Sequence, residues 1–558
     1  MILSALANNQ EAIADLICAL CVLAAIFAPP FANRGFRKIE NWGARVAARK
    51  SRAIVAAGIA PMLLRVAFLK WFPAPIPGIH DEFSYLLAAD TFAHGRLTNP
   101  TPAMWIFFET FHVNMQPTYM SKYQPGQGAI LALGQTLGHP WIGVLLSVGL
   151  MCAAIVWALQ GWFPARWALF GGAIAAIQFG IFNYWNDSYW GCAVAAIGGA
   201  LVVGALPRIV RYSRPRDSLL FGAGAAILAN TRPFEGAIFF AAASVLLAIW
   251  IGRKRRPGWR IVLRRVLAPV ALVLAAASAF MGYYNWRLTG NAALFPYELN
   301  DRTYLRTPHF VWQKLRPARE YRNAEFDSFY NDWTREIWED SRPTASWRGL
   351  QNGLFSKLGQ LQQFFLPDYL FAVVLAAMPW LWRDAKARAL AFLIGAGVCA
   401  VLVVVWFEPH YAAPVTAAVF GIVVQAMRFV RRWRVGGRRI GVGVTRGVAL
   451  FAIVSLPLNG WFAVHKDARD TNAEHMAYRA RIAGELRRLP GKQLVIVRYR
   501  PEHDPGEEWV YNGADLENGK VIWVREINDA DMRPLLNYYH DRQVWRVDAD
   551  EPRLVRIP

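Results

Sequence analysis

Two adjacent carboxylates, Asp81 and Glu82, stand in the segment HDEFSYLLAADTFAHGRL, directly after an apolar stretch of the chain. A carboxylate in a cleft that excludes water can act as a general base and remove the proton of an attacking hydroxyl group. The alternative is structural, because acidic residues at the start of a helix are stabilised by the free backbone N–H groups there. We expect Asp81 to be the base and Glu82 to orient a substrate beside it, with helix capping as the alternative.

Three cationic residues in other polar segments, Lys122, Arg232 and His410, could hold a phosphate group. Arginine contacts phosphate through two parallel hydrogen bonds, and lysine acts as a point charge. Each residue also has a plainer interpretation. Lys122 could extend along the membrane interface, Arg232 could pair with Glu235, and His410 could be packed at the interface.

Four further polar residues are weaker candidates for substrate binding, namely Glu109, Gln124, Asp187 and Glu235. Asp187 lies in the segment NYWNDSYW, where it could equally be a loop residue within a belt of interfacial aromatic residues. Like the phosphate candidates, these residues lie in or beside polar segments that separate apolar runs. Their chemistry therefore depends on which of these segments meet at one face of the protein.

The chain that must position these residues is unusually apolar. Its 558 residues are 55% hydrophobic and only 18% charged, which is typical of a membrane protein. The net charge of +22 would suit nucleic acid, but Lys and Arg occur in short clusters between apolar runs. That pattern indicates a protein that crosses the membrane many times, with lipids rather than nucleic acid as partners.

The apolar runs predict about twelve membrane spans, because a helix needs about 20 apolar residues to cross a bilayer. The expected spans are residues 12–30, 53–72, 141–159, 167–183, 190–206, 218–231, 235–251, 265–284, 367–382, 389–407, 411–427 and 447–464.

The loops between the spans alternate in charge along the chain. Basic clusters lie at 34–52, 208–216, 253–265, 383–388 and 428–446. Under the positive-inside rule these loops are cytoplasmic, so the loops 73–140 and 285–366 are expected outside. This orientation requires the apolar part of the first outer loop, residues 126–137, to lie on the membrane or dip into it. We expect the second outer loop to cover the cleft, as loops of such length often do.

The last part of the chain differs in composition. A helical stretch at 472–489 precedes the β-like runs QLVIVRY, EWVYN, KVIWVRE, QVWRVD and RLVRIP, with the helix-like run DADMRPLLNYYHD among them. Strands that alternate with a helix predict a small α/β domain. We therefore divide the chain into an N-terminal span with a basic loop (1–52), a membrane region (53–464) and an extramembrane α/β domain (465–558).

The reaction that fits these residues is attack by an acceptor hydroxyl on a sugar joined to a lipid phosphate. One carboxylate removes the hydroxyl proton, and cations stabilise the departing phosphate. A proton-coupled transporter would carry acidic or histidine residues inside its membrane spans. The expected spans of this chain have almost none. A carboxylate pair could hold a divalent metal ion, but the sequence shows no ligand set with defined spacing.

The segment HDEFSYLLAADTFAHGRL resembles the first outer-loop motif of the GT-C glycosyltransferases, in particular the protein O-mannosyltransferase and aminoarabinose-transferase branch. The resemblance implies that Asp81 is the catalytic base. The segment SKYQPGQGAILALGQTLG is similar to that family's second outer motif, although Gln124-Pro125-Gly126 replaces its His-Pro-Pro core. The likeness covers roughly residues 53–430 in layout.

The sequence thus predicts a polytopic α-helical GT-C-like membrane protein with a small C-terminal α/β domain. The expected activity is an inverting transfer of a sugar from a polyprenyl-phosphate donor to a glycan, lipid or protein acceptor. We expect the protein in a bacterial cytoplasmic (inner) membrane, with the active site and the C-terminus on the periplasmic side. The alternative function is a non-catalytic membrane protein that binds or transports a polyprenyl lipid or glycan.

Overall fold

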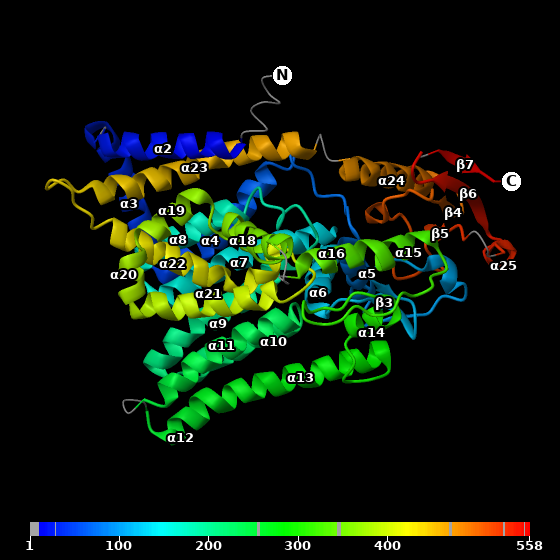
Figure 1. Cartoon of the computed structure of the whole chain (residues 1–558), viewed down its shortest axis with the longest axis horizontal. Helices are drawn as coiled ribbons and strands as arrows, with labels where there is room; N and C mark the ends of the chain where they lie inside the picture. Colours follow the sequence, from blue (N-terminus) through cyan, green and yellow to red (C-terminus); the bar gives the residue numbers. More distant parts are fainter. Residues whose placement is uncertain are drawn as a thin grey trace.

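The computed structural model shows a helical body that continues at one end into a smaller part containing a β-sheet (Figure 1). It describes residues 10–27, 29–253, 257–342, 347–467, 471–527, 531–551 and 553–557.

Within the described residues, seven helical segments are long and apolar enough to cross a membrane. The chain is a multi-pass membrane protein. The seven are α7 (Pro140–Trp162), α9 (Cys192–Tyr212), α11 (Pro233–Ile251), α12 with α13 (Trp259–Thr289), α21 (Ala385–Leu402), η5 with α22 (Pro409–Val430) and the first part of α23 (Ile440–Leu458).

The other expected spans coincide with further helices of the structure. These are α2 (Gln10–Phe27), α4 (Lys50–Ala67), α8 (Ala165–Phe179), α10 (Pro215–Ala229), α19 (Asp368–Ala376) and α20 (Met378–Arg383), and the helix α3 (Pro29–Ala48) lies between α2 and α4. The number of about twelve spans stays a prediction.

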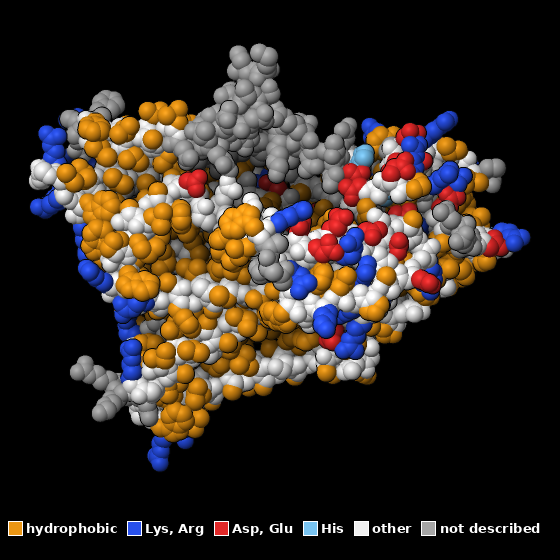
Figure 2. Space-filling view, in the orientation of Figure 1, with side chains coloured by type: hydrophobic (Ala, Val, Ile, Leu, Met, Phe, Trp, Pro, Cys, Tyr) orange, Lys and Arg blue, Asp and Glu red, His pale blue; other side chains and the backbone are white. Residues whose placement is uncertain are grey.

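Charge is distributed unevenly over the surface of the molecule (Figure 2). On the face shown, Lys and Arg gather at the edge where α3, α12 and α20 lie, and Asp and Glu gather with further basic residues at the opposite end. Apolar side chains cover most of the surface between them. This arrangement fits a membrane protein whose basic loops share one side of the bilayer.

The centre of the helical body is built from α7, α9 and α22, which carry about half of its largest buried cluster. Small residues let these helices approach closely, as is usual where helices pack inside membranes. A side chain at Gly199 of α9 would lie 2.0 Å from the carbonyl oxygen of Pro414, and one at Gly204 would lie 2.4 Å from the Trp157 ring. The packing therefore fixes where the ends of these helices meet.

The first outer segment, residues 73–140, folds into short elements at one end of this body. They are α5 (His80–Ala93), the strands β1 (Asn99–Pro100), β2 (Val113–Asn114) and β3 (Thr118–Ser121), the 3-10 turn η1 (Trp105–Phe108) and α6 (Pro125–Thr136). Strand β3 pairs antiparallel with both β1 and β2.

The second outer segment, residues 285–366, is largely helical. It contains the end of α13, then α14 (Pro296–Thr303), α15 (Ala324–Asp327), η3 (Ser328–Trp333), α16 (Thr334–Ser341), α17 (Trp347–Leu350), η4 (Gln351–Ser356) and α18 (Lys357–Phe365). Its aromatic residues Phe326 and Phe329 both pack on Phe111 at 4.6 Å between ring centroids. The two outer segments therefore form one packed unit.

The C-terminal residues form a four-stranded sheet in the order β5-β4-β6-β7. The strands are β4 (Lys492–Arg498), β5 (Val521–Arg525), β6 (Arg542–Asp548) and β7 (Leu554–Arg556), with β4 parallel to β5 and β6, and β7 antiparallel to β6. Helix α24 (Thr471–Arg488), the 3-10 turn η6 (Pro505–Glu507) and helix α25 (Arg533–Tyr538) complete this part.

One of the runs expected to be a strand, EWVYN at 508–512, is not a strand. Residues 508–511 are buried, which explains the apolar pattern, but two carbonyl groups of the run bond to a side chain instead of a neighbouring strand. The Arg479 guanidinium donates to the carbonyl oxygens of Trp509 (2.8 Å) and Tyr511 (2.9 Å). An arginine thus satisfies the backbone that a sheet would otherwise pair.

The sheet does not stand apart from the outer segments. Phe83 of α5 stacks on Tyr511 at 4.2 Å, and the Asp90 carboxylate accepts a hydrogen bond from the Ala514 amide at 2.7 Å. The His80 ring lies 2.6 Å from the Pro505 carbonyl oxygen. The C-terminal part therefore supports the helix that carries the adjacent carboxylates.

Candidate active site

Asp81 lies in the first turn of α5 but does not cap it. The N-cap position is Ile79, and no side chain caps the helix there. The Asp81 carboxylate instead accepts a short hydrogen bond from the Tyr123 hydroxyl, and its Oδ1 lies 3.3 Å from Nδ1 of His112. The side chain is 29% exposed, so the carboxylate is held from two sides and remains open to a substrate.

The two partners of Asp81 are fixed by serine hydroxyls. Ser84, one turn further along α5, donates to the His112 carbonyl oxygen at 2.7 Å and lies 2.7 Å from the Ser121 hydroxyl. Ser121 in turn accepts from the Tyr123 amide at 3.1 Å. The His112 backbone has φ of +61°, a conformation that costs a non-glycine residue free energy and is often found at functional sites. The strained backbone presents the imidazole to Asp81.

The charges around Asp81 keep its carboxylate ionised. Burial alone would raise the pKa of Asp81, but His112 and Lys122 outweigh burial and hold this pKa well below its usual range. Burial lowers the pKa of His112 to about 4, with a further contribution from Lys122, so the imidazole is neutral at pH 7. Burial also lowers the pKa of Lys122, although Asp301 and Asp81 oppose it.

A second cationic side chain, Arg232, lies at the start of α11 and faces the same region. Its guanidinium lies 3.8 Å over the Tyr411 ring. In the part of the chain that the structure describes, this guanidinium makes no hydrogen bond or ion pair. Both Asp81 and Arg232 act electrostatically on His410 and on Tyr85. The structure thus brings Asp81, Lys122, Arg232 and His410 into one electrostatic neighbourhood.

The position of Arg232 depends on a glycine in the segment QPGQG. The Gly126 amide donates to the Asn230 carbonyl oxygen at 2.8 Å. A side chain at Gly126 would lie 2.5 Å from Thr231 Cγ2 and 2.6 Å from the Asn230 carbonyl oxygen. Only glycine allows α6 to begin this close to the residues that precede Arg232. Gln124 is the N-cap residue of α6, and its buried Nε2 has no hydrogen-bond partner among the described residues.

Glu82 and Asp187 hold the outer loops in place. The two Glu82 oxygens accept from the backbone amides of Gly78 (2.7 Å) and Tyr189 (2.9 Å), and burial raises the pKa of Glu82 to about 7. Asp187 pairs with Arg65 at 2.6 Å. Arg65 is fully buried and also donates to the carbonyl oxygen of Phe72 at 2.6 Å. Each acid thus joins its own segment to a distant one, Glu82 to the loop at Tyr189 and Asp187 to α4 at Arg65.

Glu235, Glu109 and His410 lie in different surroundings. Glu235 is buried in the first turn of α11 and interacts electrostatically with Arg232 without forming an ion pair. Glu109 lines a cavity in the outer segments, where Tyr304 donates to its Oε1 at 2.9 Å. The His410 ring lies 3.0 Å from the Tyr184 hydroxyl and 4.4 Å from the Trp190 ring, so its Nδ1 has a partner within the protein.

Sequence reasoning missed His112, Tyr123 and Tyr411. Tyr123 directly follows Lys122, and Tyr411 directly follows His410. Their position next to a predicted site residue is the sequence signal that could have identified both tyrosines. His112 has no comparable signal, because its imidazole meets Asp81 only through the fold. Among the described residues, no group of three or more His, Cys, Asp or Glu side chains is placed to hold a metal ion.

No family model matches the sequence, and no curated protein matches it. The structure is similar to that of ArnT from Cupriavidus metallidurans bound to undecaprenyl phosphate, with a TM-score of 0.51, 15% identity and coverage of 88% of this chain and 92% of ArnT. The apo state of the same ArnT has a TM-score of 0.47, 14% identity and coverage of 88% and 93%.

A further similar structure is the Archaeoglobus fulgidus oligosaccharyltransferase with a tethered acceptor peptide, with a TM-score of 0.44 and 11% identity over 81% of this chain and 62% of that one. The likeness to the undecaprenyl phosphate complex of ArnT shows that this chain has the GT-C fold. The polytopic helical fold that the sequence predicted is confirmed, and the number of spans stays a prediction.

Proposed function

We propose that the protein is a glycosyltransferase that moves a sugar from a polyprenyl-phosphate carrier to an acceptor hydroxyl. The observation that carries the proposal is an ionised, partly exposed Asp81 held by Tyr123 and His112, with Lys122 and Arg232 in the same neighbourhood. The shared fold adds support, because the similar ArnT structure contains undecaprenyl phosphate. The site would lie at the periplasmic face of a bacterial cytoplasmic membrane.

In the proposed reaction, Asp81 takes the proton of the acceptor hydroxyl as its oxygen attacks the anomeric carbon. The bond between that carbon and the phosphate oxygen breaks, and polyprenyl phosphate leaves with the electron pair. Asp81 later releases its proton to water. One displacement from the face opposite the phosphate inverts the anomeric centre. The leaving group needs cationic stabilisation more than a general acid.

Lys122 and Arg232 would bind the donor phosphate, and His410 would lie close to it. Arg232 is suited to this role because its guanidinium, held over Tyr411, has no carboxylate partner at ion-pair distance among the described residues. Lys122 lowers the pKa of Asp81 in the free protein. A phosphate bound to Lys122 would offset that effect and raise the pKa of Asp81. The base would therefore become stronger when the donor is in place.

The other predicted residues would act through position. Glu82 and Asp187 hold the loops on either side of the site. Gln124 is the N-cap residue at the start of α6, which contacts the turn between α10 and α11 before Arg232. Glu235 would orient Arg232 electrostatically. Removing any one of these should change substrate affinity and turnover together, because the site would be displaced as a whole.

The test uses full-length protein in lipid vesicles, supplied with a panel of undecaprenyl-phosphate sugars that carry a radiolabelled sugar. The proposal predicts release of undecaprenyl phosphate and transfer of label to an acceptor, with inversion at the anomeric carbon. Intact movement of the labelled lipid across the bilayer, without release, would instead support a non-catalytic carrier. Accessibility of a cysteine introduced beside residue 81 to an impermeant thiol reagent tests the side of the membrane.

A further inference from the structure

A large cavity lies in the outer segments, beside the stretch that carries His112. Its volume is about 1370 Å³, and it is bounded by residues 101–117, by α14 and by the loop that precedes α15. Pockets for small molecules usually measure roughly 300–1000 Å³. The cavity therefore has room for a chain of several small units.

A buried carboxylate in the lining of this cavity has spare hydrogen-bonding capacity. Glu109 is only 5% exposed, and a carboxylate offers about four acceptor sites. Among the described residues it accepts one good hydrogen bond, from Tyr304 at 2.9 Å, and two long contacts from Arg322 at 3.4 and 3.5 Å. Burial raises the pKa of Glu109, against the effects of Tyr304 and Arg322. A ligand hydroxyl could supply the missing donor.

Aromatic side chains line the cavity beside this carboxylate. Trp105, Tyr304 and Tyr321 belong to its walls, and the Arg322 guanidinium lies 4.9 Å over the Trp105 ring. Arg322 thereby lies between the ring and Glu109. A rigid ring that offers an apolar face, next to a carboxylate that accepts from hydroxyl groups, is a combination that recognises sugars.

The charge of the lining favours an uncharged ligand. Glu109 and Glu320 are balanced by Arg319 and Arg322, and the acidic member Glu109 is the more deeply buried. A phosphorylated ligand would have to place its charge near that buried carboxylate, at an electrostatic cost. A neutral sugar would meet no such cost.

The cavity and the candidate base share one stretch of chain. Glu109 stands three residues before His112, whose imidazole lies 3.3 Å from Asp81. Three residues span at most about 11 Å. Phe111 between them packs on His80 at 4.5 Å and on Phe326 at 4.6 Å, which holds this stretch rigid. A short oligosaccharide in the cavity could therefore extend toward Asp81.

We propose that this cavity binds a neutral oligosaccharide and that the acceptor of the transfer is such a glycan. The proposal rests on the function proposed above and adds the chemical class of the acceptor. Glu109 would accept hydrogen bonds from sugar hydroxyls, and Trp105 would pack on the apolar face of a sugar ring. Glu109 is then an acceptor-binding residue and takes no part in the proton transfer.

The test measures binding of neutral di- to tetrasaccharides to full-length protein in nanodiscs by titration calorimetry, with the phosphorylated forms of the same glycans in parallel. Wild type should bind a neutral glycan, and Glu109→Gln should weaken binding about tenfold or more, as expected for a lost bond to a charged group. Trp105→Leu should weaken it comparably. Glu298→Gln is the matched control, because Glu298 lies on α14, pairs with Arg302 and does not line the cavity.

The outcomes separate this inference from the proposed function. Asp81→Asn should lose transfer but keep the part of the glycan affinity that depends on Glu109 and Trp105, because Asp81 lies outside the cavity lining. Absence of binding by every neutral glycan, preference for the phosphorylated forms or for a peptide, or unchanged affinity in both cavity variants would overturn the inference, even if the protein consumes a lipid-linked sugar. Glycan binding with no consumption of any lipid-linked sugar would support the cavity and contradict the transferase. Thermal unfolding of Glu109→Gln checks that the variant is folded.

Discussion

The substitution Gly126→Ala should impair the site without touching a substrate. The added methyl group would start 2.5 Å from Thr231 Cγ2, where ordinary contact begins at 3.4 Å, and 2.6 Å from the Asn230 carbonyl oxygen. The start of α6 and the turn before Arg232 must therefore move apart by about 0.9 Å. Overpacking of this kind costs about 1–3 kcal/mol, and Gly126 is too near the helix start to recover much of it as helix propensity.

The functional effect of this substitution follows from the displacement of Arg232. A misplacement of about 1 Å can reduce a rate by about 100-fold, so we expect a rise in KM for the polyprenyl-phosphate donor and a lower kcat. The assay compares donor kinetics and thermal unfolding of Gly126→Ala with those of Gly395→Ala, whose methyl group would meet nothing within 4 Å on α21. Wild-type stability and donor kinetics in the Gly126 variant would refute the reasoning, since the contact would then be unimportant.

Three further variants test other contacts. The pKa of Glu82 is raised from 4.5 to about 7, so protonation of Glu82 favours the folded state, and the free energy of unfolding should fall by about 3 kcal/mol as pH rises from about 4.5 to 7. Glu82→Gln should flatten this pH dependence in thermal unfolding measured over the same pH range. An unchanged slope would contradict the assignment. Arg525→Met should cost about 3–5 kcal/mol in chemical unfolding, because the buried Arg525 pairs with Glu508 and, at 2.9 Å, with Glu325, and a cost below 1 kcal/mol would be inconsistent with that pairing. His112→Asn places a residue that tolerates a positive φ at this position and should raise the pKa of Asp81. The acidic limb of the pH profile of kcat/KM should therefore move to higher pH. A limb that stays in place would show that His112 does not set the pKa of Asp81.

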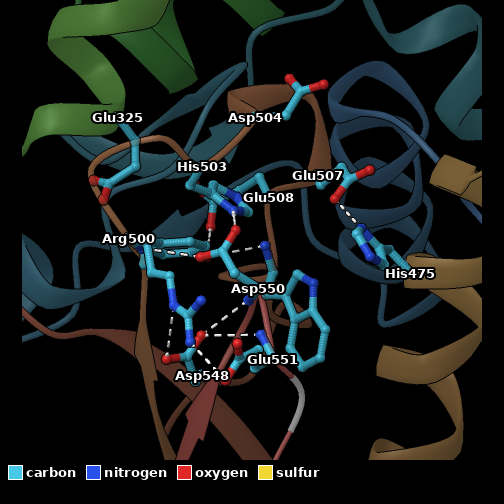
Figure 3. A network of polar contacts seen from close by, with 12 residues as sticks. Glu325, His475, Arg500, His503, Asp504, Glu507, Glu508, Asp548, Asp550 and Glu551 are labelled. Atoms are coloured by element: carbon cyan, nitrogen blue, oxygen red, sulfur yellow. Dashed lines mark hydrogen bonds and ion pairs between the residues drawn. The ribbon is translucent and has the colours of Figure 1, made fainter.

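The C-terminal part carries a dense polar network that ties its loops together (Figure 3). His503 lies 2.7 Å from the Asp550 carboxylate, and Arg500 pairs with Asp548 at 3.6 Å and Glu551 at 2.7 Å. Glu507 accepts a short contact from His475 of α24. These contacts stabilise the region whose Pro505 carbonyl lies against His80 at the start of α5. A packing role for the sheet follows from this.

The sequence was sufficient for a polytopic helical fold, because long apolar runs are local features, and it singled out Asp81 because an acidic pair follows one of these runs. It also predicted that Lys122, Arg232 and His410 share a region, since alternating basic loops place their segments on one side. The sequence could not show that Asp187, unlike these three residues, is engaged in a structural ion pair, because its partner Arg65 lies 122 positions away in the chain. The same limit applies to His112, whose meeting with Asp81 depends on serine contacts between distant segments.

The strand expected at 508–512 shows a second limit of local patterns. Alternating apolar residues report burial, and a buried segment becomes a strand only if a neighbouring strand accepts its backbone. Here Arg479 bonds to that backbone. Arg479 lies some 30 residues earlier in the chain, and no local sequence pattern predicts that it bonds to this segment.

The central claim is that the ionised Asp81 is the base in transfer from a polyprenyl-phosphate sugar. The most direct measurement compares wild type and Asp81→Asn in single-turnover release of undecaprenyl phosphate, together with the Kd of the same donor. Asparagine keeps the size of the side chain and removes its proton affinity. We predict a rate lower by about 100- to 10,000-fold with nearly unchanged donor affinity. Wild-type turnover in Asp81→Asn, or a loss of donor binding that accounts for the whole effect, would contradict the claim.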